Sequence, residues 1–342
     1  MAGEGTEPEP TAHRPRQRAT SRDVARAAGV SQNTVSLVLR GSTRISPATQ
    51  ARVRTAMQRL GYQPNAVAAA LRSRTTRALL FVAPRAAVHT HLNAELLAGV
   101  TDEAAADAYS VLVRAVGADG AEAVESYRGQ WVSGAVVFAS SVREAAVEAL
   151  VAAGCPTVAM ITACTACPPE RTVVAADGDG AAQAVRHLLA RGHRRLGLVS
   201  TPGVPGGEIS AARVGGARLA AAAGAADLAE VVVGDWGARE GLAGGARLLA
   251  RSNRPTAIFA ISDNLALGVM RAAAQAGLRV PEDVAVVGFD NRDWGEYCTP
   301  PLTTVEFPVY EIGRAAVRRL LHPEDAGGPG RVAARLLVRA SS

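Results

Sequence analysis

Residues 21–41 read SRDVARAAGVSQNTVSLVLRG, and this stretch decides the fold of the amino-terminal part of the chain. Apolar residues recur at helical spacing on both sides of the tripeptide GVS at residues 29–31. The glycine allows a tight turn, the valine can be buried in it, and the serine can cap the helix that follows. The spacing therefore predicts a helix-turn-helix, two short helices that meet at a steep angle.

Each of the two predicted helices has an apolar side, marked by Val24 with Ala28 and by Val35 with Leu39. The rest of the second helix is polar, and amide side chains can read adenine while an aliphatic tip can touch a thymine methyl group. The alternative is a pair of ordinary surface helices, because the helix-turn-helix is a generic shape. The side chains that we predict to contact DNA from this region are Ser31, Gln32, Asn33, Thr34, Ser36, Leu37 and Arg40.

The positive charge of the chain is concentrated around this stretch. The 342 residues include 37 arginines, no lysine and 31 acids, for a net charge of +6. Residues 11–77 hold thirteen of the arginines and a single acid, Asp23, so the remainder of the chain is net negative. Because the planar guanidinium suits phosphate oxygens, this one-sided cluster indicates a nucleic acid as partner.

A third helix and a hinge are predicted next. Ser46 can cap a helix that has Pro47 in its first turn and ends at Gly61. After it, Asn65 can cap an alanine-rich helix over 66–72, which is too short to be stable alone. A conditional helix between two domains is expected to act as a hinge.

From Arg77 onward, strand-like and helix-like segments alternate, which predicts an α/β fold with parallel sheets. About 265 residues exceed what one sheet comfortably holds, so we expect two lobes with a ligand crevice at the carboxyl ends of the strands. The predicted strands are ALLFVA, SVLVRAV, GAVVFAS, TVAMI, RLGLVS, AEVVVGD, TAIFAIS and DVAVVGFD.

Other features of the sequence limit the compartment. Four scattered cysteines do not form a disulfide framework, which indicates a reducing compartment. No apolar run reaches the length of about 18 residues that a membrane span needs. Residues 1–20 are polar, lack the apolar core of a signal peptide, and are expected to form a disordered tail. We therefore expect a cytoplasmic protein without a membrane partner.

By its motifs the chain resembles the LacI/GalR (lac-repressor) family of bacterial transcription regulators. The headpiece and hinge likeness lies in RDVARAAGVSQNTVSLVLRG and ISPATQARVRTAMQRLGYQPNAVAAALRS. Further likeness lies in HLLARGHRRLGLVS, RPTAIFAISDNLALG, GLRVPEDVAVVGFDN and PPLTTVEF, so it spans nearly the whole chain after residue 20.

The resemblance implies an organisation in four parts. A disordered tail over 1–20 precedes a helix-turn-helix headpiece over 21–64 and a hinge helix and linker over 65–76. Residues 77–342 are expected to form a two-lobed domain, like periplasmic sugar-binding proteins, that binds an effector and dimerises. The chain is expected to cross between the lobes near Val174, near Val305 and in the glycine-rich stretch around 328, before a last strand over 332–339.

The resemblance also implies further DNA contacts. Asn65, Ala68 and Leu71 of the hinge are expected to bind DNA, with Leu71 wedged into the minor groove. Leu37 stands where some relatives carry arginine, so a guanine contact is expected to give way to thymine-methyl preference. Binding to a palindromic operator as a homodimer is expected.

For the effector, the resemblance implies that an arginine and a carboxylate, Arg213 and Asp290, face each other across the crevice and hold a polyhydroxylated ligand. Trp236 matches a position whose indole can stack on a sugar ring. The complete set of expected effector contacts is His91, Asn93, Arg213, Trp236, Ser262 and Asp290.

Four positions depart from the family pattern. Residues 90–93 read THLN and lack the usual aromatic platform, and Met160-Ile161-Thr162 replaces a strand end with a carboxylate. Ser262 stands for an asparagine, and Ala217 for an aromatic residue. The ligand is therefore expected to differ from a common hexose, and it need not be a sugar.

The sequence thus predicts a ligand-responsive transcription regulator, a repressor, that takes no cofactor. The alternatives are a small-molecule binding protein and an enzyme on the same α/β fold, because fold does not determine chemistry. We find no set of nucleophile, base and orienting residue that supports an enzyme. The Cys164/Cys167 pair has metal-ligand spacing but no partner pair, so a structural or incidental role is expected and no metal site.

Overall fold

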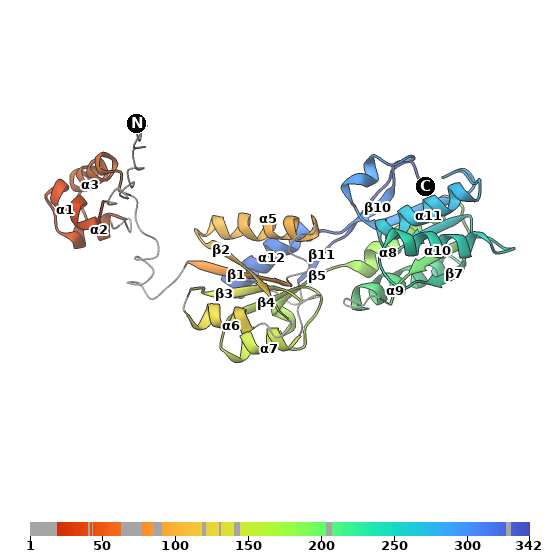
Figure 1. Cartoon of the computed structure of the whole chain (residues 1–342), viewed down its shortest axis with the longest axis horizontal. Helices are drawn as coiled ribbons and strands as arrows, with labels where there is room; N and C mark the ends of the chain where they lie inside the picture. The colour runs from red at the N-terminus through yellow and green to blue at the C-terminus, as the bar shows by residue number, and fades with distance from the viewer. Residues whose placement is uncertain are drawn as a thin grey trace, which may run out of the picture. The chain divides into compact units, whose positions relative to one another are not determined.

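The computed structural model describes residues 19–39, 42, 44–62, 77–84, 91–117, 121–129, 131–139, 144–202, 207–325 and 330–342. The chain divides into two compact units, Met1–Thr75 and Thr76–Ser342 (Figure 1). Residues 1–18 of the expected tail and the hinge at 65–76 lie outside the described residues, as do Arg40 and the glycine-rich stretch around 328, whereas Thr20 of the expected tail belongs to the start of the first helix.

Within its described residues the first unit holds three helices, α1 (Ser21–Ala28), α2 (Gln32–Leu39) and α3 (Pro47–Leu60). Ser46 caps α3 next to the helical Pro47 as expected, and α1 is capped by Thr20 in a capping box with Asp23, which was not predicted from the sequence. Gly29 and Gly61 end α1 and α3 with φ of +63° and +58°, which glycine adopts without strain. The small core that joins the helices consists of Val24, Ala25, Ala28, Val35, Val38, Val53 and Ala56.

One detail of the predicted pattern is corrected. The sequence pairs Val35 with Leu39 on the buried side of α2, but Leu39 is 40% exposed and Val38 is 6% exposed. The buried residues of α2 therefore follow a three-residue spacing, because Val35 and Val38, and not Leu39, lie on the side of the helix that packs into the headpiece core.

The second unit begins with a lobe built on a parallel six-stranded sheet of order β11-β5-β4-β3-β1-β2. Its strands are β1 (Ala78–Pro84), β2 (Ser110–Val116), β3 (Gly134–Phe138), β4 (Thr157–Ile161), β5 (Thr172–Ala175) and β11 (Gly330–Val332). Its helices are α5 (His91–Ala106), α6 (Ala121–Arg128), α7 (Glu144–Ala152) and α12 (Val309–Leu321).

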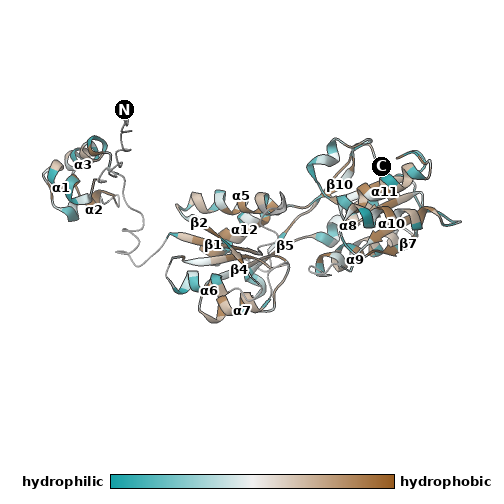
Figure 2. Ribbon diagram, in the orientation of Figure 1, coloured by the Kyte–Doolittle hydropathy of each residue, from teal (hydrophilic) through white to brown (hydrophobic). Residues whose placement is uncertain are grey.

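Helices cover both faces of this sheet (Figure 1). Alternate residues of β1 enter two different cores: Leu79 and Phe81 pack with residues of α5 and α12, and Leu80 and Val82 with residues of α6 and α7. Such strands are apolar on both sides, which is why they read as continuous aliphatic runs (Figure 2).

The second lobe has a sheet of order β12-β10-β9-β8-β6-β7, parallel except for β12, which pairs antiparallel with β10. Its strands are β6 (Arg195–Ser200), β7 (Asp227–Val232), β8 (Ala257–Ala260), β9 (Ala285–Asp290), β10 (Thr303–Glu306) and β12 (Arg335–Leu337). Its helices are α8 (Asp177–Ala190), α9 (Gly207–Ala223), α10 (Ala238–Leu249) and α11 (Asp263–Gln275). Single 3₁₀ turns lie at Pro169–Arg171, Asp293–Glu296 and Pro323–Asp325.

The chain passes between the two sheets three times, after β5, after β10 and between β11 and β12. The first two places lie next to the expected Val174 and Val305. The third lies between Val332 and Arg335, and the single strand expected over 332–339 is instead two short strands in different sheets. The hydropathy pattern does not indicate the break between β11 and β12, because each of these strands is only three residues long.

Two backbones meet closely where α9 packs on α8. A Cβ on Gly216 would lie 2.0 Å from the carbonyl oxygen of Gly178, far inside van der Waals contact. Because only a glycine fits there, the axes of the two helices can approach closely, and this places the start of α8 beside the middle of α9.

Candidate functional site

The start of α2 is held by a serine cap. The Ser31 hydroxyl accepts a hydrogen bond from the backbone N–H of Thr34 at 3.0 Å, and the two hydroxyl groups lie 2.9 Å apart. Ser31 thus caps the helix as the sequence predicts. Its hydroxyl and that of Thr34 serve the helix start, and a contact of either with DNA stays a prediction.

The predicted DNA-reading side chains of α2 lie outside the headpiece core. Asn33 is exposed, and Gln32, Ser36 and Leu37 are half-buried. The Gln32 side chain is not free, because its Nε2 donates a hydrogen bond to the Ser21 hydroxyl at 2.8 Å. The sequence indicated no role for Ser21.

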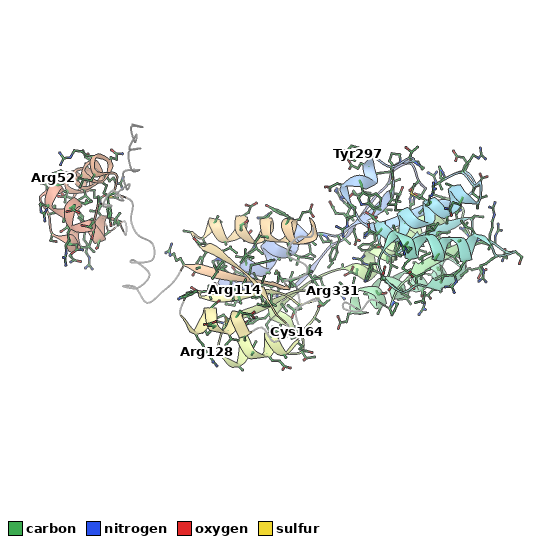
Figure 3. The ribbon with its side chains drawn as sticks, in the orientation of Figure 1. Arg52, Arg114, Arg128, Cys164, Tyr297 and Arg331 are labelled. Carbon is green, nitrogen blue, oxygen red and sulfur yellow. The ribbon has the colours of Figure 1, made fainter. Side chains whose placement is uncertain are left out.

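The third helix, α3, adds positive charge to the headpiece. Arg52, Arg54 and Arg59 are all exposed, and Figure 3 shows Arg52 on the outside of the headpiece. An exposed guanidinium can bind phosphate oxygens without a large desolvation cost. The headpiece therefore offers a helix with polar side chains together with exposed positive charges.

The expected effector residues of the second lobe centre on Arg213, which is 2% exposed in the middle of α9. Its Nη1 donates to the Asp290 carboxylate at 2.9 Å and to the carbonyl oxygen of Ile261 at 2.7 Å. Arg213 and Asp290 therefore meet, but both belong to the second lobe, which corrects the expectation that they face each other across the crevice.

A third partner, Asp177, was not predicted. The Asp177 carboxylate accepts a hydrogen bond from Nε of Arg213 at 2.7 Å and is 5% exposed. Asp177 is the first residue of α8, directly after the first crossing between the lobes. Its position between the end of a strand and the start of a helix could have marked Asp177 as a candidate. Nothing in the sequence, however, connects residue 177 to residue 213.

Aromatic rings surround the guanidinium. The Arg213 Cζ lies 3.6 Å from the ring centroid of Phe289, 5.2 Å from that of Phe307 and 5.9 Å from that of Trp236. These distances are in the range of cation–π attraction, which is stronger in a desolvated site. Trp236 is half-buried, and stacking of its indole on a ligand stays a prediction.

The Asp290 backbone is strained. Its φ is +117° and that of Asn291 is +55°, values that residues with a Cβ rarely adopt. The Asn291 side chain is held in place by Arg339, whose Nη2 donates to it at 2.9 Å. Burial raises the pKa of Asp290, while the charge of Arg213 opposes that rise. Strain and burial at the end of β9 are typical of a functional site.

Behind Asp290 lies a fully buried acid, Asp263. It accepts hydrogen bonds from the Thr304 hydroxyl at 2.5 Å and from the backbone N–H of Arg292 at 2.6 Å. Burial, and then the negative charge of Asp290, raise its pKa to about 7. A Cβ on Gly288 would lie 2.3 Å from its carboxylate, so this glycine makes room for the acid.

The other predicted effector residues take different places. Ser262 is 2% exposed and caps α11 by accepting from the N–H of Leu265 at 3.2 Å, so its hydroxyl serves the helix. His91 and Asn93 lie in the first turn of α5, and their side chains are outside the described part of the structure. Ala217 is fully buried in the core of the lobe, and Met160, Ile161 and Thr162 are at most 4% exposed.

The cysteine pair forms a turn after β4. The N–H of Cys167 donates to the carbonyl oxygen of Cys164 at 3.1 Å. Burial raises the pKa of both thiols, that of Cys167 to about 11, so both are protonated at neutral pH. In the described ranges, every helix is too short or too polar to cross a lipid bilayer.

Comparisons with known proteins decide the family. The model of "Bacterial regulatory proteins, lacI family" matches residues 20–65, and that of a "Periplasmic binding protein-like domain" matches residues 185–342. Catabolite control protein A of Priestia megaterium is 33% identical over 307 residues, which cover 87% of this chain and 90% of the relative. This chain belongs to the lacI family.

Other members of the lacI family are similarly close. The lactose operon repressor of Escherichia coli is 32% identical over 87% of this chain and 83% of its own length, and the regulator CelR of Thermobifida fusca is 34% identical over 90% and 92%. A crystal structure of the lac repressor dimer bound to operator and the anti-inducer ONPF matches with a TM-score of 0.80. That match has 28% identity and covers 95% of this chain and 99% of the other.

Proposed function

We propose that this lacI-family protein is a cytoplasmic transcriptional repressor that binds a palindromic operator as a homodimer and responds to a small polar effector. The observation that carries the proposal is the headpiece, in which the buried valines of α2 leave its polar side chains outside the core while α3 carries exposed arginines. A single headpiece offers few base contacts. Two headpieces on a two-fold axis double them, with half-sites about one helical turn apart.

For the hinge, we propose the DNA contacts that the family resemblance implies. Asn65, Ala68 and Leu71 would contact DNA when the segment becomes helical, and Leu71 would enter the minor groove. A wedge of this kind costs a few kcal/mol of base unstacking, which the added contacts to bent DNA can offset. Leu71→Ala should then weaken specific binding far more than non-specific binding, and equal losses of both would refute the wedge.

The effector would bind at the carboxyl ends of β8 and β9, where Ile261 and Asp290 hold Arg213. The positive charge of Arg213 is more than offset by its two bonded carboxylates, Asp177 and Asp290. Its Nη2 has no hydrogen-bond partner among the described residues and can donate to a ligand. Such a site offers hydrogen bonds and aromatic surface without uncompensated positive charge for an anion, which favours an uncharged polar ligand.

The function is tested by selecting DNA from random duplexes with the full-length protein and measuring affinity by fluorescence anisotropy. A dimer that neutralises about 6 to 10 phosphates should lose about 10³- to 10⁵-fold in affinity between 50 and 200 mM salt. The selected sequence should be an inverted repeat. Tight binding by a monomer, or a salt-insensitive complex, would refute the proposal.

The effector is sought by a thermal-shift screen of uncharged sugars, nucleosides and small acids. A ligand at about 100 times its dissociation constant should stabilise the protein by about 2.7 kcal/mol. Substitution of Trp236 by leucine should abolish that shift and leave DNA selection intact. A verified effector whose shift is unchanged in Trp236→Leu would place the site elsewhere.

A further inference from the structure

The starts of the two helices of the helix-turn-helix are joined by one side-chain hydrogen bond. Gln32 is the first residue of α2 and Ser21 the first residue of α1. The Nε2 of Gln32 donates to the Ser21 hydroxyl at 2.8 Å, and both residues are half-buried. The amide of the leading side chain of α2 is therefore oriented by a residue outside that helix.

Ser21 is itself held firmly in place. The residue before it, Thr20, forms a reciprocal capping box with Asp23, with Thr20 N–H to carboxylate at 2.9 Å and Asp23 N–H to hydroxyl at 3.3 Å. The hydrogen bonds from Thr20 also lower the pKa of Asp23, so the box is intact at neutral pH. The start of α1 is thus a fixed support for the Gln32 amide.

The bond leaves half of the amide for a ligand. An amide nitrogen carries two hydrogens, so one N–H and the carbonyl oxygen of Gln32 stay available. One donor beside one acceptor is the pattern that adenine complements in the major groove with its N7 and N6. A glutamine without a support would have to lose side-chain freedom when it bound a base.

We propose that Ser21 is a specificity-determining residue, which positions the Gln32 amide to read adenine at one symmetric pair of operator positions. This inference rests on the proposed function, because it concerns the choice of base within an operator. Ser21 acts through Gln32, and it is a positioning residue. A search for specificity residues that considers only the second helix would miss Ser21, which lies on the first.

The test compares base preference in four variants of the full-length protein, with duplexes selected from a random library by the wild type. These variants are Ser21→Ala, Ser21→Thr, Gln32→Ala and the double substitution Ser21→Ala/Gln32→Ala. The measured quantity is the ratio of affinities for the A·T pair and for each other base pair at the position that Gln32→Ala affects. Circular dichroism of each variant checks that the headpiece is folded, which alanine at a helix start should permit.

We expect Ser21→Ala to reduce this ratio about 3- to 10-fold, the size of one lost hydrogen bond, and Ser21→Thr, which keeps the hydroxyl, to restore it to within about two-fold. In the Gln32→Ala background, Ser21→Ala should change the ratio less than about two-fold, because the side chain it supports is absent. An equal loss in both backgrounds would show that Ser21 acts independently of Gln32 and would overturn the proposal.

Two further results would overturn it. An unchanged ratio in Ser21→Ala would show that the bond does not serve recognition, and a preference for another base at the Gln32 position would refute the adenine assignment. Both results leave the proposed function standing, since the wild type still selects an operator. If the wild type selects no sequence at all, the proposed function fails first, and the inference fails with it.

Discussion

Two neighbouring glycines of α9 should respond to alanine in opposite directions. A Cβ on Gly216 would meet the Gly178 carbonyl oxygen at 2.0 Å and its carbonyl carbon at 2.7 Å, whereas a Cβ on Gly215 meets nothing within 4 Å. Both residues are helical, so alanine gains about 0.5–1 kcal/mol of helix propensity at either position. Only at Gly216 must α8 and α9 move apart by more than an ångström.

The expected magnitudes follow from these distances. Gly215→Ala should stabilise the second unit by about 0.5–1 kcal/mol, because nothing opposes the gain in propensity. Gly216→Ala should destabilise it by about 2–3 kcal/mol, since overpacking costs about 1–3 kcal/mol or more and the obstacle here is backbone that no rotamer can move. The separation should also stretch the bond from Arg213 to Asp177 and weaken effector binding.

Tryptophan fluorescence during urea unfolding measures this difference. All three tryptophans, Trp131, Trp236 and Trp294, lie in the second unit, so the signal is insensitive to unfolding of the headpiece. A shift of the midpoint at constant slope would report stability alone. If Gly216→Ala were as stable as Gly215→Ala, the close approach of α8 and α9 would not exist as described, and the account of how Asp177 reaches Arg213 would fail.

Three other substitutions have defined outcomes. The pKa of Asp263 is raised from 3.8 to about 7, so the native state binds this proton more tightly than the unfolded chain does. The free energy of unfolding should therefore fall as pH rises from 4 to 7. At 1.36 kcal/mol per pKa unit, the fall is about 4 kcal/mol. Asp263→Asn should remove this fall in urea unfolding across that range, and an identical pH profile would contradict it. Asp177→Ala should cost about 3 kcal/mol of stability, since it removes one of the two carboxylates that compensate a guanidinium buried to 2% exposure; wild-type stability of this variant would mean that Asp290 alone suffices. Leu37→Arg should change the preferred base at one symmetric pair of operator positions in a DNA selection, and an unaltered preference would make Leu37 a packing residue.

For the candidate site, the sequence could indicate single residues but not their partners. Arg213 and Asp290 are recognisable from their motifs, and the structure brings them to 2.9 Å. Their separation of 77 residues, and the 36 residues between Asp177 and Arg213, are bridged only by packing of α8 on α9 and of α9 against the end of β9. The same holds for Gln32, whose partner Ser21 lies on another helix.

What the sequence by itself determined is the local structure, because its signals act within a few residues. Capping by Ser31 and Ser46, the glycines 29 and 61 at the helix ends, and the eight aliphatic runs are all present as predicted. What only the tertiary structure decided are contacts between distant segments: which valine of α2 is buried, where the last strands part, and which carboxylates neutralise Arg213. The physical reason is that burial and ion pairing depend on which surfaces meet. The residues next to a side chain in the sequence do not indicate which distant surface it will contact.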